Sequence, residues 1–250
     1  MKTVLVAINA KYIHSNLAVY SLRSYARTFG YEPELLEFTI NQQKDQILKG
    51  IYEAKPDLLC FSCYIWNLSY AEEIIEDIKK ILPEVTIWAG GPEVSYDAPK
   101  FLKRHPEVDG IMCAEGEKTL TELINYYEIG KSQGESLDGI NGIVYQENKT
   151  IHQTPLRDIM NMDDLVFPYE DLKDFEHKII YYESSRGCPF SCSYCLSSID
   201  KKLRFRSFSL VEKELEFFLA HKVPQVKFVD RTFNCKKSHA MAIWNYIKEH

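Results

Sequence analysis

The sequence predicts an α/β protein, in which a doubly wound parallel sheet is followed by a second, incomplete set of βα units. Two observations support this fold class. Short apolar runs alternate with segments of helical periodicity through residues 1–130, as in parallel sheets that carry helices on both faces. A polar, aperiodic stretch fills 131–178, and the alternation resumes over 179–250. We therefore expect a Rossmann-like domain, a hairpin with a linker, and the beginning of a second domain over these three ranges.

The first domain is expected to contain five parallel strands and the helices between them. Short apolar runs predict strands over 3–9, 33–40, 57–66, 86–91 and 108–116. Apolar residues with a period near 3.6 predict helices over 17–29, 45–54, 69–82 and 119–127. Such sheets bind ligands at the carboxyl ends of their strands, so the candidate binding loops are 10–16, 63–69, 90–95 and 114–119.

The hairpin and the second domain are expected from the later segments. NGIVYQ and TIHQTP, at 141–146 and 150–155, predict a hairpin across a polar turn. After the linker, strands are expected over 178–185 and 225–230, and helices over 207–221 and from about Ser238 onward. Ser209 and Glu212 have the spacing of a capping box. Two βα units cannot cover their own sheet, so we expect the chain to be truncated inside its second domain.

Composition excludes several classes of protein. The 250 residues are 45% hydrophobic, and the net charge of −6 argues against a protein that binds nucleic acid through its overall charge. The basic stretch KKLRFR at 201–206 is interpreted as a solvated loop, with a local basic patch as the alternative. There is no recognisable signal peptide, and no apolar run approaches the roughly 20 residues that span a bilayer. We expect a cytoplasmic protein with no membrane partner and no nucleic-acid partner.

Three of the seven cysteines, Cys188, Cys192 and Cys195, follow the spacing C-x3-C-x2-C. An odd number of cysteines in a chain with ample apolar sequence favours metal or redox chemistry over disulfides. Structural zinc sites usually have four closed ligands, whereas the next cysteine along the chain is Cys235. Three thiolates suit a four-iron cluster whose fourth iron stays open for a small molecule. A zinc site is the alternative.

With Tyr194 directly before the last cysteine, this motif resembles the signature of the radical SAM superfamily. The resemblance implies that Cys188, Cys192 and Cys195 hold a 4Fe-4S cluster and that S-adenosylmethionine (SAM) binds the open iron. Reductive cleavage of SAM would then give methionine and a 5′-deoxyadenosyl radical. The resemblance also implies that 179–250 is the N-terminal part of a (β/α) barrel of the TIM-barrel type, with Tyr194 beside the adenine.

A second motif refines this resemblance. Phe228, Asp230 and Phe233 match the Phe-x-Asp-x-x-Phe pattern of one radical SAM subgroup, in place of a Gly-Gly-Glu motif that this chain lacks. The match implies that Asp230, at the carboxyl end of a strand, accepts a hydrogen bond from the SAM amine. An ion pair of Asp230 with Arg186 or Arg231 is the alternative.

The same subgroup carries an N-terminal cobalamin-binding domain, which residues 1–130 resemble. The matching segments are NAKYIHSNLAVYSLRSY, FSCYIWN, AGGPEVS and AEGEKT, each at the carboxyl end of an expected strand. The cobalamin site that this resemblance implies includes Tyr12, His14, Ser62, Tyr64, Trp66, Asn67, Gly90, Gly91, Pro92, Glu115 and Gly116. Glycines would let the backbone approach a flat macrocycle. The Asp-x-His-x-x-Gly motif that supplies a cobalt ligand in many such domains is absent, so His14 is interpreted as a loop-packing residue rather than a ligand.

Together these resemblances imply a cobalamin-dependent radical SAM enzyme that transfers a methyl group to, or rearranges, a small-molecule or biosynthetic substrate of unknown identity. The deoxyadenosyl radical would take hydrogen from the substrate, and an electron donor such as flavodoxin or ferredoxin would reduce the cluster. One alternative is a radical SAM enzyme whose Rossmann-like domain no longer binds cobalamin. Another is a non-catalytic zinc-binding module.

Three other cysteines invite further interpretations. Cys60 and Cys63 form a C-x-x-C pair, but they lie in an apolar strand rather than at the start of a helix. Strand alternation would send the two side chains to opposite faces, so we interpret both as buried structural thiols. Cys60, Cys63 and Cys113 also resemble the second cluster site of methylthiotransferases, although the first strand ends without the cysteine that this group requires.

Overall fold

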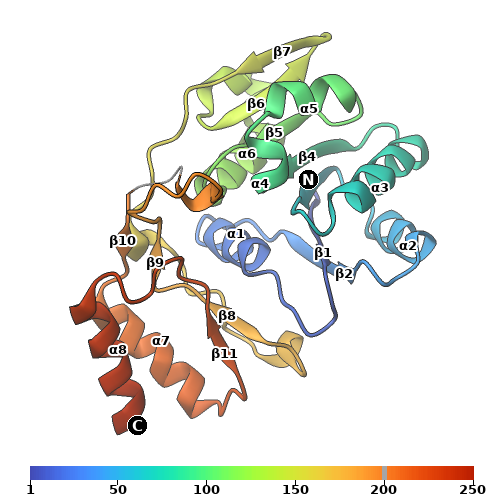
Figure 1. Ribbon diagram of the computed structural model, residues 1–250. Coiled ribbons are helices and arrows are strands. Elements are labelled where there is room, and N and C mark those ends of the chain that lie inside the picture. Colours follow the sequence, from blue (N-terminus) through green and yellow to red (C-terminus); the bar gives the residue numbers. More distant parts are fainter. Residues whose placement is uncertain (199–201) are drawn as a thin grey trace. The chain divides into compact units, whose positions relative to one another are not determined.

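The computed structural model describes residues 1–198 and 202–250, which form two compact units, Met1–Ile159 and Met160–His250 (Figure 1). The basic stretch 201–206 therefore lies partly outside the described residues. Within the described ranges, no helix combines the length and the apolar character that a membrane crossing requires.

The first unit is built on a single sheet with the strand order β2-β1-β3-β4-β5-β6-β7. Its strands are β1 (Thr3–Asn9), β2 (Glu34–Thr39), β3 (Leu58–Ser62), β4 (Thr86–Gly90), β5 (Gly110–Met112), β6 (Ile143–Glu147) and β7 (Thr150–Gln153). The first five strands are parallel, as predicted, and the last two run antiparallel to their neighbours. Since β2 and β3 flank β1 on opposite sides, the strand order reverses between β1 and β3, the position at which such sheets bind ligands.

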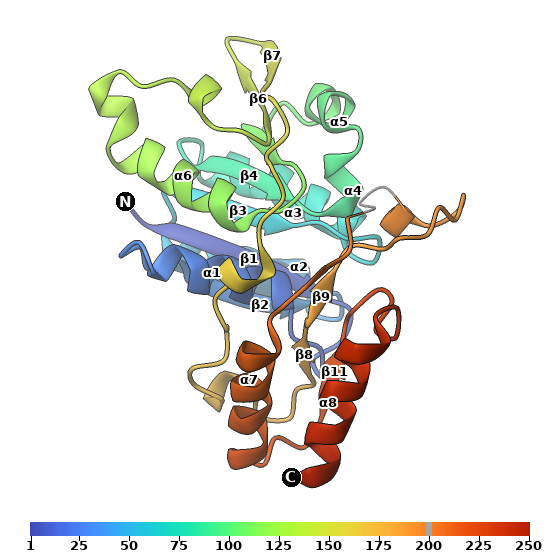
Figure 2. The same ribbon diagram turned by 90° about the vertical axis from the view of Figure 1, so that its left-hand side faces the viewer.

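Helices cover both faces of this sheet, which confirms the doubly wound arrangement (Figures 1 and 2). On one face, α1 (Leu17–Arg27) packs against α6 (Glu117–Glu128). On the other, α2 (Lys44–Ala54), α3 (Leu68–Ile81) and α5 (Ala98–Arg104) bury their apolar residues in one cluster with those of the strands. Both faces of the sheet are therefore shielded from solvent, which explains why the strands appear in the sequence as nearly unbroken apolar runs.

Side-chain alternation decides which face each strand residue joins. On β3, Leu59 and Phe61 belong to the core beneath α2 and α3, whereas Cys60 between them is buried on the face of α1 and α6. The predicted helical period is also observed, because α3 buries Ala71, Ile74, Ile75 and Ile78.

Several element boundaries differ from the prediction. The third strand ends at Ser62 instead of residue 66, because residues 63–67 form a hydrogen-bonded turn. The short α4 (Pro92–Ser95) and α5 were not predicted, since Pro92 and Pro99 interrupt the apolar pattern of this segment. The predicted hairpin is present as β6 and β7, and its pairing with β5 extends the first sheet.

The second unit contains two short pairs of strands and two helices. β8 (Ile180–Tyr182) pairs in parallel with β11 (Val226–Phe228), and β9 (Ser185–Arg186) pairs antiparallel with β10 (Arg204–Phe205). α7 (Phe208–Ala220) follows β10, and α8 (Lys237–Glu249) follows β11. The two predicted βα units are thus present, whereas the described part of this unit contains no closed barrel.

The start of α7 differs from the prediction. The helix begins at Phe208 after Ser207, and Ser207 makes no capping hydrogen bond through its side chain. Ser209 therefore lies inside the helix, and the predicted capping box with Glu212 is wrong. Leu219, near the end of the helix, is 41% exposed.

A buried ion pair, absent from the prediction, occupies the core of the second unit. The guanidinium of Arg206 lies 2.6 Å from the carboxylate of Glu214, and both side chains are 7% exposed. Tyr182 donates its hydroxyl to the same carboxylate at 2.6 Å, and Arg206 also donates to the carbonyl oxygen of Met162. Burial beside this carboxylate raises the pKa of Tyr182. The network joins α7 to β8 and to the segment after β10.

Candidate cofactor-binding sites

The residues predicted to bind cobalamin lie at one edge of the first sheet. The carboxyl ends of β1, β3, β4 and β5 lie at this edge because the strands are parallel, and they lead into the segments that carry Tyr12, His14, Ser62, Tyr64, Trp66, Asn67, Gly90, Gly91, Pro92, Glu115 and Gly116. Large apolar side chains are exposed in these segments: Tyr12 (63%), Ile13 (45%), Ile65 (81%), Trp66 (44%) and Tyr96 (54%). Exposed apolar groups gathered in adjoining loops are typical of a binding surface.

The loop between β1 and α1 is held by hydrogen bonds at its two ends, and its middle residues are exposed to solvent. Asn9, the last residue of β1, donates from Nδ2 to the carbonyl oxygen of His14 at 3.0 Å. Asn16, at the far end of the loop, is buried and donates from Nδ2 to Ser62 Oγ at 2.9 Å. Tyr12 lies at the exposed crest, whereas half-buried His14 takes part in the loop's own hydrogen bonding through its backbone.

Glu37 on β2 joins this loop, although the sequence patterns did not indicate it. Its Oε1 atom accepts from Asn9 Nδ2 at 3.0 Å and from the backbone N–H of Asn16 at 3.2 Å. Its Oε2 atom accepts from the hydroxyl of Tyr20 at 2.5 Å. The available signal was a carboxylate in the middle of an otherwise apolar strand, where an ionised group needs partners.

The loop between β3 and α3 is organised around Asn67. Its side chain is 1% exposed, donates to the carbonyl oxygens of Ile8 and Ser62 at 2.9 and 3.0 Å, and accepts from the backbone N–H of Tyr64 at 2.7 Å. The rings of Tyr64 and Trp66 stack at 4.6 Å, nearly parallel at 6°. Asn67 thus links this turn to β1 and holds a flat aromatic pair at the edge of the sheet.

Gly90 and Gly91 have different roles. Gly91 has a φ of +108°, and a Cβ atom there would lie 2.3 Å from the carbonyl oxygen of Cys63. A Cβ atom on Gly90 would meet Met112 at an ordinary 3.6 Å. The fold itself therefore requires glycine at 91 but not at 90. Pro92, the first residue of α4, follows directly.

The segment between β5 and α6 turns through Ala114, whose φ is +62°. Glu115 is partly exposed, and a Cβ atom on Gly116 would approach Cδ2 of Leu22 to 3.0 Å. Buried Glu117 accepts a hydrogen bond from Ser21 Oγ at 3.0 Å. Gly116 thus allows α6 to pack closely against α1.

Cys60, Cys63 and Cys113 are buried, as expected for structural thiols. Cys63 and Cys113 belong to the core under α2 and α3, whereas Cys60 lies on the opposite face of the sheet. Burial raises the pKa of Cys60 and of Cys63 to about 12 and that of Cys113 to about 11. The burial of these thiols on two faces of the sheet argues against a redox pair or a second cluster.

The three clustered cysteines lie on the segment that connects β9 to β10. Gly187, at its start, has a φ of +88°, and a Cβ atom there would lie 2.4 Å from the carbonyl oxygen of Lys202. Cys188 is buried, Cys192 and Cys195 are exposed, and the N–H of Cys195 donates to the carbonyl oxygen of Cys192 at 3.2 Å. Tyr194 is 91% exposed.

These three thiols are not gathered into a ligand set. No group of three cysteine, histidine or acidic side chains within 1–198 and 202–250 is arranged to hold a metal ion. What the chain provides is a donor set of the right chemistry on one short segment. The assignment of the thiols as cluster ligands therefore stays a prediction.

Asp230, which follows β11, accepts hydrogen bonds from two serines, Ser184 after β8 and Ser185 at the start of β9. It accepts from Ser184 Oγ at 2.8 Å and from Ser185 Oγ at 2.5 Å, whereas Arg186 pairs with Glu183 at 2.7 Å. Arg186 thus pairs with a different carboxylate, and an ion pair of Asp230 with Arg231 stays the alternative.

Ser184 links Asp230 to a histidine. Because a carboxylate only accepts, the Ser184 hydroxyl donates to Asp230, and its oxygen accepts from Nε2–H of His239, 3.0 Å away. Burial lowers the pKa of His239, which favours the neutral imidazole. No sequence pattern indicated the role of His239, because its partner Ser184 lies 55 residues earlier in the chain.

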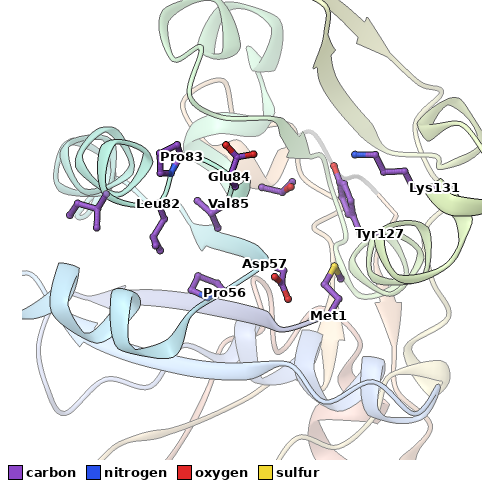
Figure 3. Close-up of a pocket in the computed structure, with 11 residues that line it drawn as sticks. Met1, Pro56, Asp57, Leu82, Pro83, Glu84, Val85, Tyr127 and Lys131 are labelled. Carbon is purple, nitrogen blue, oxygen red and sulfur yellow. The ribbon is translucent and has the colours of Figure 1, made fainter.

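A separate depression of about 620 Å³ lies at the opposite, amino edge of the first sheet. Figure 3 shows Tyr127 and Lys131 at one side of it and Pro83 and Glu84 at the other, with Asp57 below. It contains none of the residues predicted to bind a cofactor.

Comparison with known proteins identifies the first unit. Residues 3–124 match the B12 binding domain family. An uncharacterized methyltransferase of Pyrococcus horikoshii, PH0819, is 29% identical over 213 residues, which cover 81% of this chain and 46% of the relative. The cobalamin-dependent radical SAM methyltransferase TokK of Streptomyces tokunonensis is 29% identical over 231 residues, 84% of this chain and 32% of TokK. The chain thus spans between a third and a half of the length of these relatives.

Solved structures support the same fold. The cobalamin-dependent S-adenosylmethionine radical enzyme OxsB, solved with aqua-cobalamin and S-adenosylmethionine bound, superposes with a TM-score of 0.79 at 23% identity and covers 99% of this chain and 37% of OxsB. The radical S-adenosylmethionine methyltransferase TsrM of Kitasatospora setae superposes with a TM-score of 0.72 at 20% identity, over 100% of this chain and 51% of TsrM. Residues 3–124 therefore match the B12 binding domain family, and the chain is similar in sequence to the cobalamin-dependent radical SAM methyltransferase TokK and in fold to OxsB and TsrM.

Proposed function

We propose that the first unit binds cobalamin across the carboxyl edge of its sheet. The observation that carries this proposal is the match of 3–124 to the B12 binding domain family, which spans β1 to α6 and thus all four loops at that edge. The exposed apolar side chains there, among them Tyr12, Ile65 and Trp66, suit a large macrocycle that covers them.

The residues of this edge fit a flat, wide ligand. The stacked rings of Tyr64 and Trp66 would offer an aromatic surface, and Gly90 carries no side chain where a corrin would approach the backbone. Half-buried His14 would pack in its loop without binding cobalt. Bound there, cobalamin would supply a carrier for a methyl group.

We further propose that the second unit contributes to a SAM-cleaving site. Cys188, Cys192 and Cys195 provide three thiol donors, the set that leaves one iron of a four-iron cluster open. Asp230, which is hydrogen-bonded to Ser184 and Ser185, would accept a hydrogen bond from the amine of SAM. Exposed Tyr194 would lie against the adenine. When bound, the cluster would supply the electron that cleaves SAM.

The reaction that these parts support is methyl transfer to an unidentified small molecule, driven by an external electron donor such as flavodoxin or ferredoxin. TokK and PH0819 are both described as methyltransferases, which favours methylation over rearrangement. The substrate-binding residues are expected in the part of such enzymes that this chain does not cover.

Cobalamin binding is tested by absorbance. The purified chain is incubated with hydroxocobalamin, passed through a desalting column, and examined for the corrin bands. Retention of about one equivalent is expected. A protein without corrin absorption would instead support the alternative in which the Rossmann-like domain no longer binds cobalamin.

The cluster is tested by anaerobic reconstitution with iron and sulfide, followed by metal analysis and a reductant-dependent assay for 5′-deoxyadenosine. Cys192→Ala should lose the iron and the product. Cys235→Ala is the matched control, since Cys235 is also exposed but lies outside the motif. Zinc without iron in the unsubstituted protein would favour the zinc-binding module.

A further inference from the structure

Glu37 occupies a position where three strands and one loop meet. It lies on β2 opposite Ala7 of β1, on the face that α1 covers. Donors reach it from Asn9 at the end of β1, from Asn16 at the start of α1, and from Tyr20 one turn further along the helix. One carboxylate therefore contacts both ends of the loop at 10–16.

The network continues from this carboxylate toward β3. Asn9 also bonds to the carbonyl oxygen of His14, and Asn16 also bonds to Ser62 Oγ. Asn9 and Asn16 are 5% and 7% exposed. The hydrogen bonds thus connect Glu37 on β2 to the end of β1 through Asn9 and to β3 through Asn16, at the point where the strand order reverses.

The chemistry of the donors favours a carboxylate at this position. An ionised carboxylate accepts through both oxygens and cannot donate, which suits three donors that converge on it. Hydrogen bonds to a charged group are about twice as strong as those between neutral groups. Because its two ends are fixed, the loop needs little further ordering when a ligand covers its crest, and pre-ordering strengthens binding.

We propose that Glu37 is a positioning residue for the corrin: it holds the loop at 10–16 in the conformation in which Tyr12 and Ile13 contact the cofactor. This inference rests on the proposed binding of cobalamin. Glu37 is placed to act through Asn9, Asn16 and Tyr20.

The substitution Glu37→Gln tests this role with little change in size. One oxygen becomes an NH2 group, which cannot accept, so at least one donor from Asn9, Asn16 or Tyr20 loses its partner. The matched control is Asp109→Asn, since Asp109 accepts from the backbone N–H of Ile87 at 2.7 Å at the amino edge of the same sheet. Tyr20→Phe is a milder variant that removes one donor only.

Binding of hydroxocobalamin is titrated by absorbance for the full 250-residue chain and for each variant, and hydrogen exchange is followed in the unliganded proteins. For Glu37→Gln we expect a Kd raised about tenfold, the size of one lost hydrogen bond to a charged group, with faster exchange confined to the loop at 10–16. Tyr20→Phe should raise Kd by a smaller factor. If Glu37→Gln does not fold, the Kd of Tyr20→Phe is the measurement that tests the role of Glu37. Asp109→Asn should leave Kd unchanged.

Two outcomes would overturn the inference alone. One is that the unsubstituted chain binds hydroxocobalamin and Glu37→Gln, or Tyr20→Phe in its place, binds it with the same Kd. The other is that Asp109→Asn weakens binding as much as Glu37→Gln, which would mean a general loss of stability. If the unsubstituted chain does not bind hydroxocobalamin at all, the proposed function fails and the inference fails with it.

Discussion

At the scale of single residues, Gly91 is the position where the fold leaves no space for a side chain. A Cβ atom there would lie 2.3 Å from a backbone oxygen, at a φ that only glycine adopts readily. We expect Gly91→Ala to lower the free energy of unfolding by about 2 kcal/mol. Gly90→Ala is the control, because its Cβ would meet only ordinary contacts. Urea unfolding followed by circular dichroism measures both, and equal stability of the two variants would contradict the structure at this turn.

The buried thiols predict a dependence of stability on pH. Burial raises the pKa of Cys60 and Cys63 from an ordinary 9.0 to about 12. The folded state therefore holds these protons more tightly than the unfolded chain, so their contribution is complete below about pH 9 and is lost as the pH rises toward 12. Unfolding midpoints measured from pH 8 to 11 should fall accordingly. A midpoint that rises across this range would contradict the burial of these thiols.

Alkylation distinguishes the two kinds of cysteine directly. Iodoacetamide at pH 8 should label exposed Cys192, Cys195 and Cys235 in the folded protein and leave Cys60 and Cys63 unlabelled until urea unfolds the first unit. Peptide mass spectrometry reports each site separately. Labelling of Cys60 in the absence of denaturant would count against its place in the sheet.

The sequence predicts single residues well where a pattern assigns them a face, and poorly where a partner comes from far along the chain. Alternation in the expected strand over 57–66 predicted that Cys60 and Cys63 lie on opposite faces, as observed, although Cys63 itself follows the end of β3. Glu37 and His239 were missed because their partners, Asn9 and Ser184, are brought to them only by the sheet and by the packing of α8. Contacts between residues that are distant in the sequence produce no periodic pattern from which they could be predicted.

At the scale of elements, the buried pair of Arg206 and Glu214 fixes α7 to its surroundings. Removing one partner leaves a buried charge without compensation, so Glu214→Ala should destabilise the second unit by about 3–5 kcal/mol. Glu76→Ala is the control, since Glu76 pairs with Lys80 on the surface of α3 and such pairs contribute about 0–1 kcal/mol. Chemical denaturation compares the two variants, and a small effect of Glu214→Ala would mean that the pair is not buried in solution.

Elements with a long apolar repeat were predicted almost to the residue, as α3 and α2 illustrate. Boundaries failed where tertiary contacts override the pattern. The third strand stops early because Asn67 organises a turn within an apolar run. The capping box at Ser209 fails because β10 leads the chain directly into Phe208. The sequence also predicts the hairpin, but its attachment to β5 depends on pairing between strands 31 residues apart, as in Met112 and Ile143.

At the scale of the whole molecule, the two units should respond differently to cofactor. A ligand that binds only the folded first unit stabilises it by RT ln(1 + [L]/Kd), about 2.7 kcal/mol at a free concentration of 100 Kd. Hydroxocobalamin should therefore slow the most protected amides of β1, β3 and β4 in native-state hydrogen exchange by about a hundredfold. Amides of β8 and β11 serve as the internal control and should change little. Equal slowing in both units would contradict a binding site confined to the first.

The cofactor assignments are supported more strongly for the first unit than for the second. For the first unit, the B12-domain match covers the carboxyl-edge loops that contain the sequence motifs, while the individual residues of the site stay a prediction. For the second, the motif supplies three thiols that the structure, over the residues it describes, does not arrange as a ligand set.

The outer strands of the first sheet have a consequence for how copies of the protein meet. β7 is four residues long and contains Thr150, His152 and Gln153, while β2 begins at Glu34, which is paired with Lys2 at 2.7 Å. Short or charged edge strands make it unfavourable for a neighbouring chain to add a strand to the sheet. The shortness of β7 and the charged pair at the start of β2 should therefore oppose the addition of a strand from a second copy at these two borders.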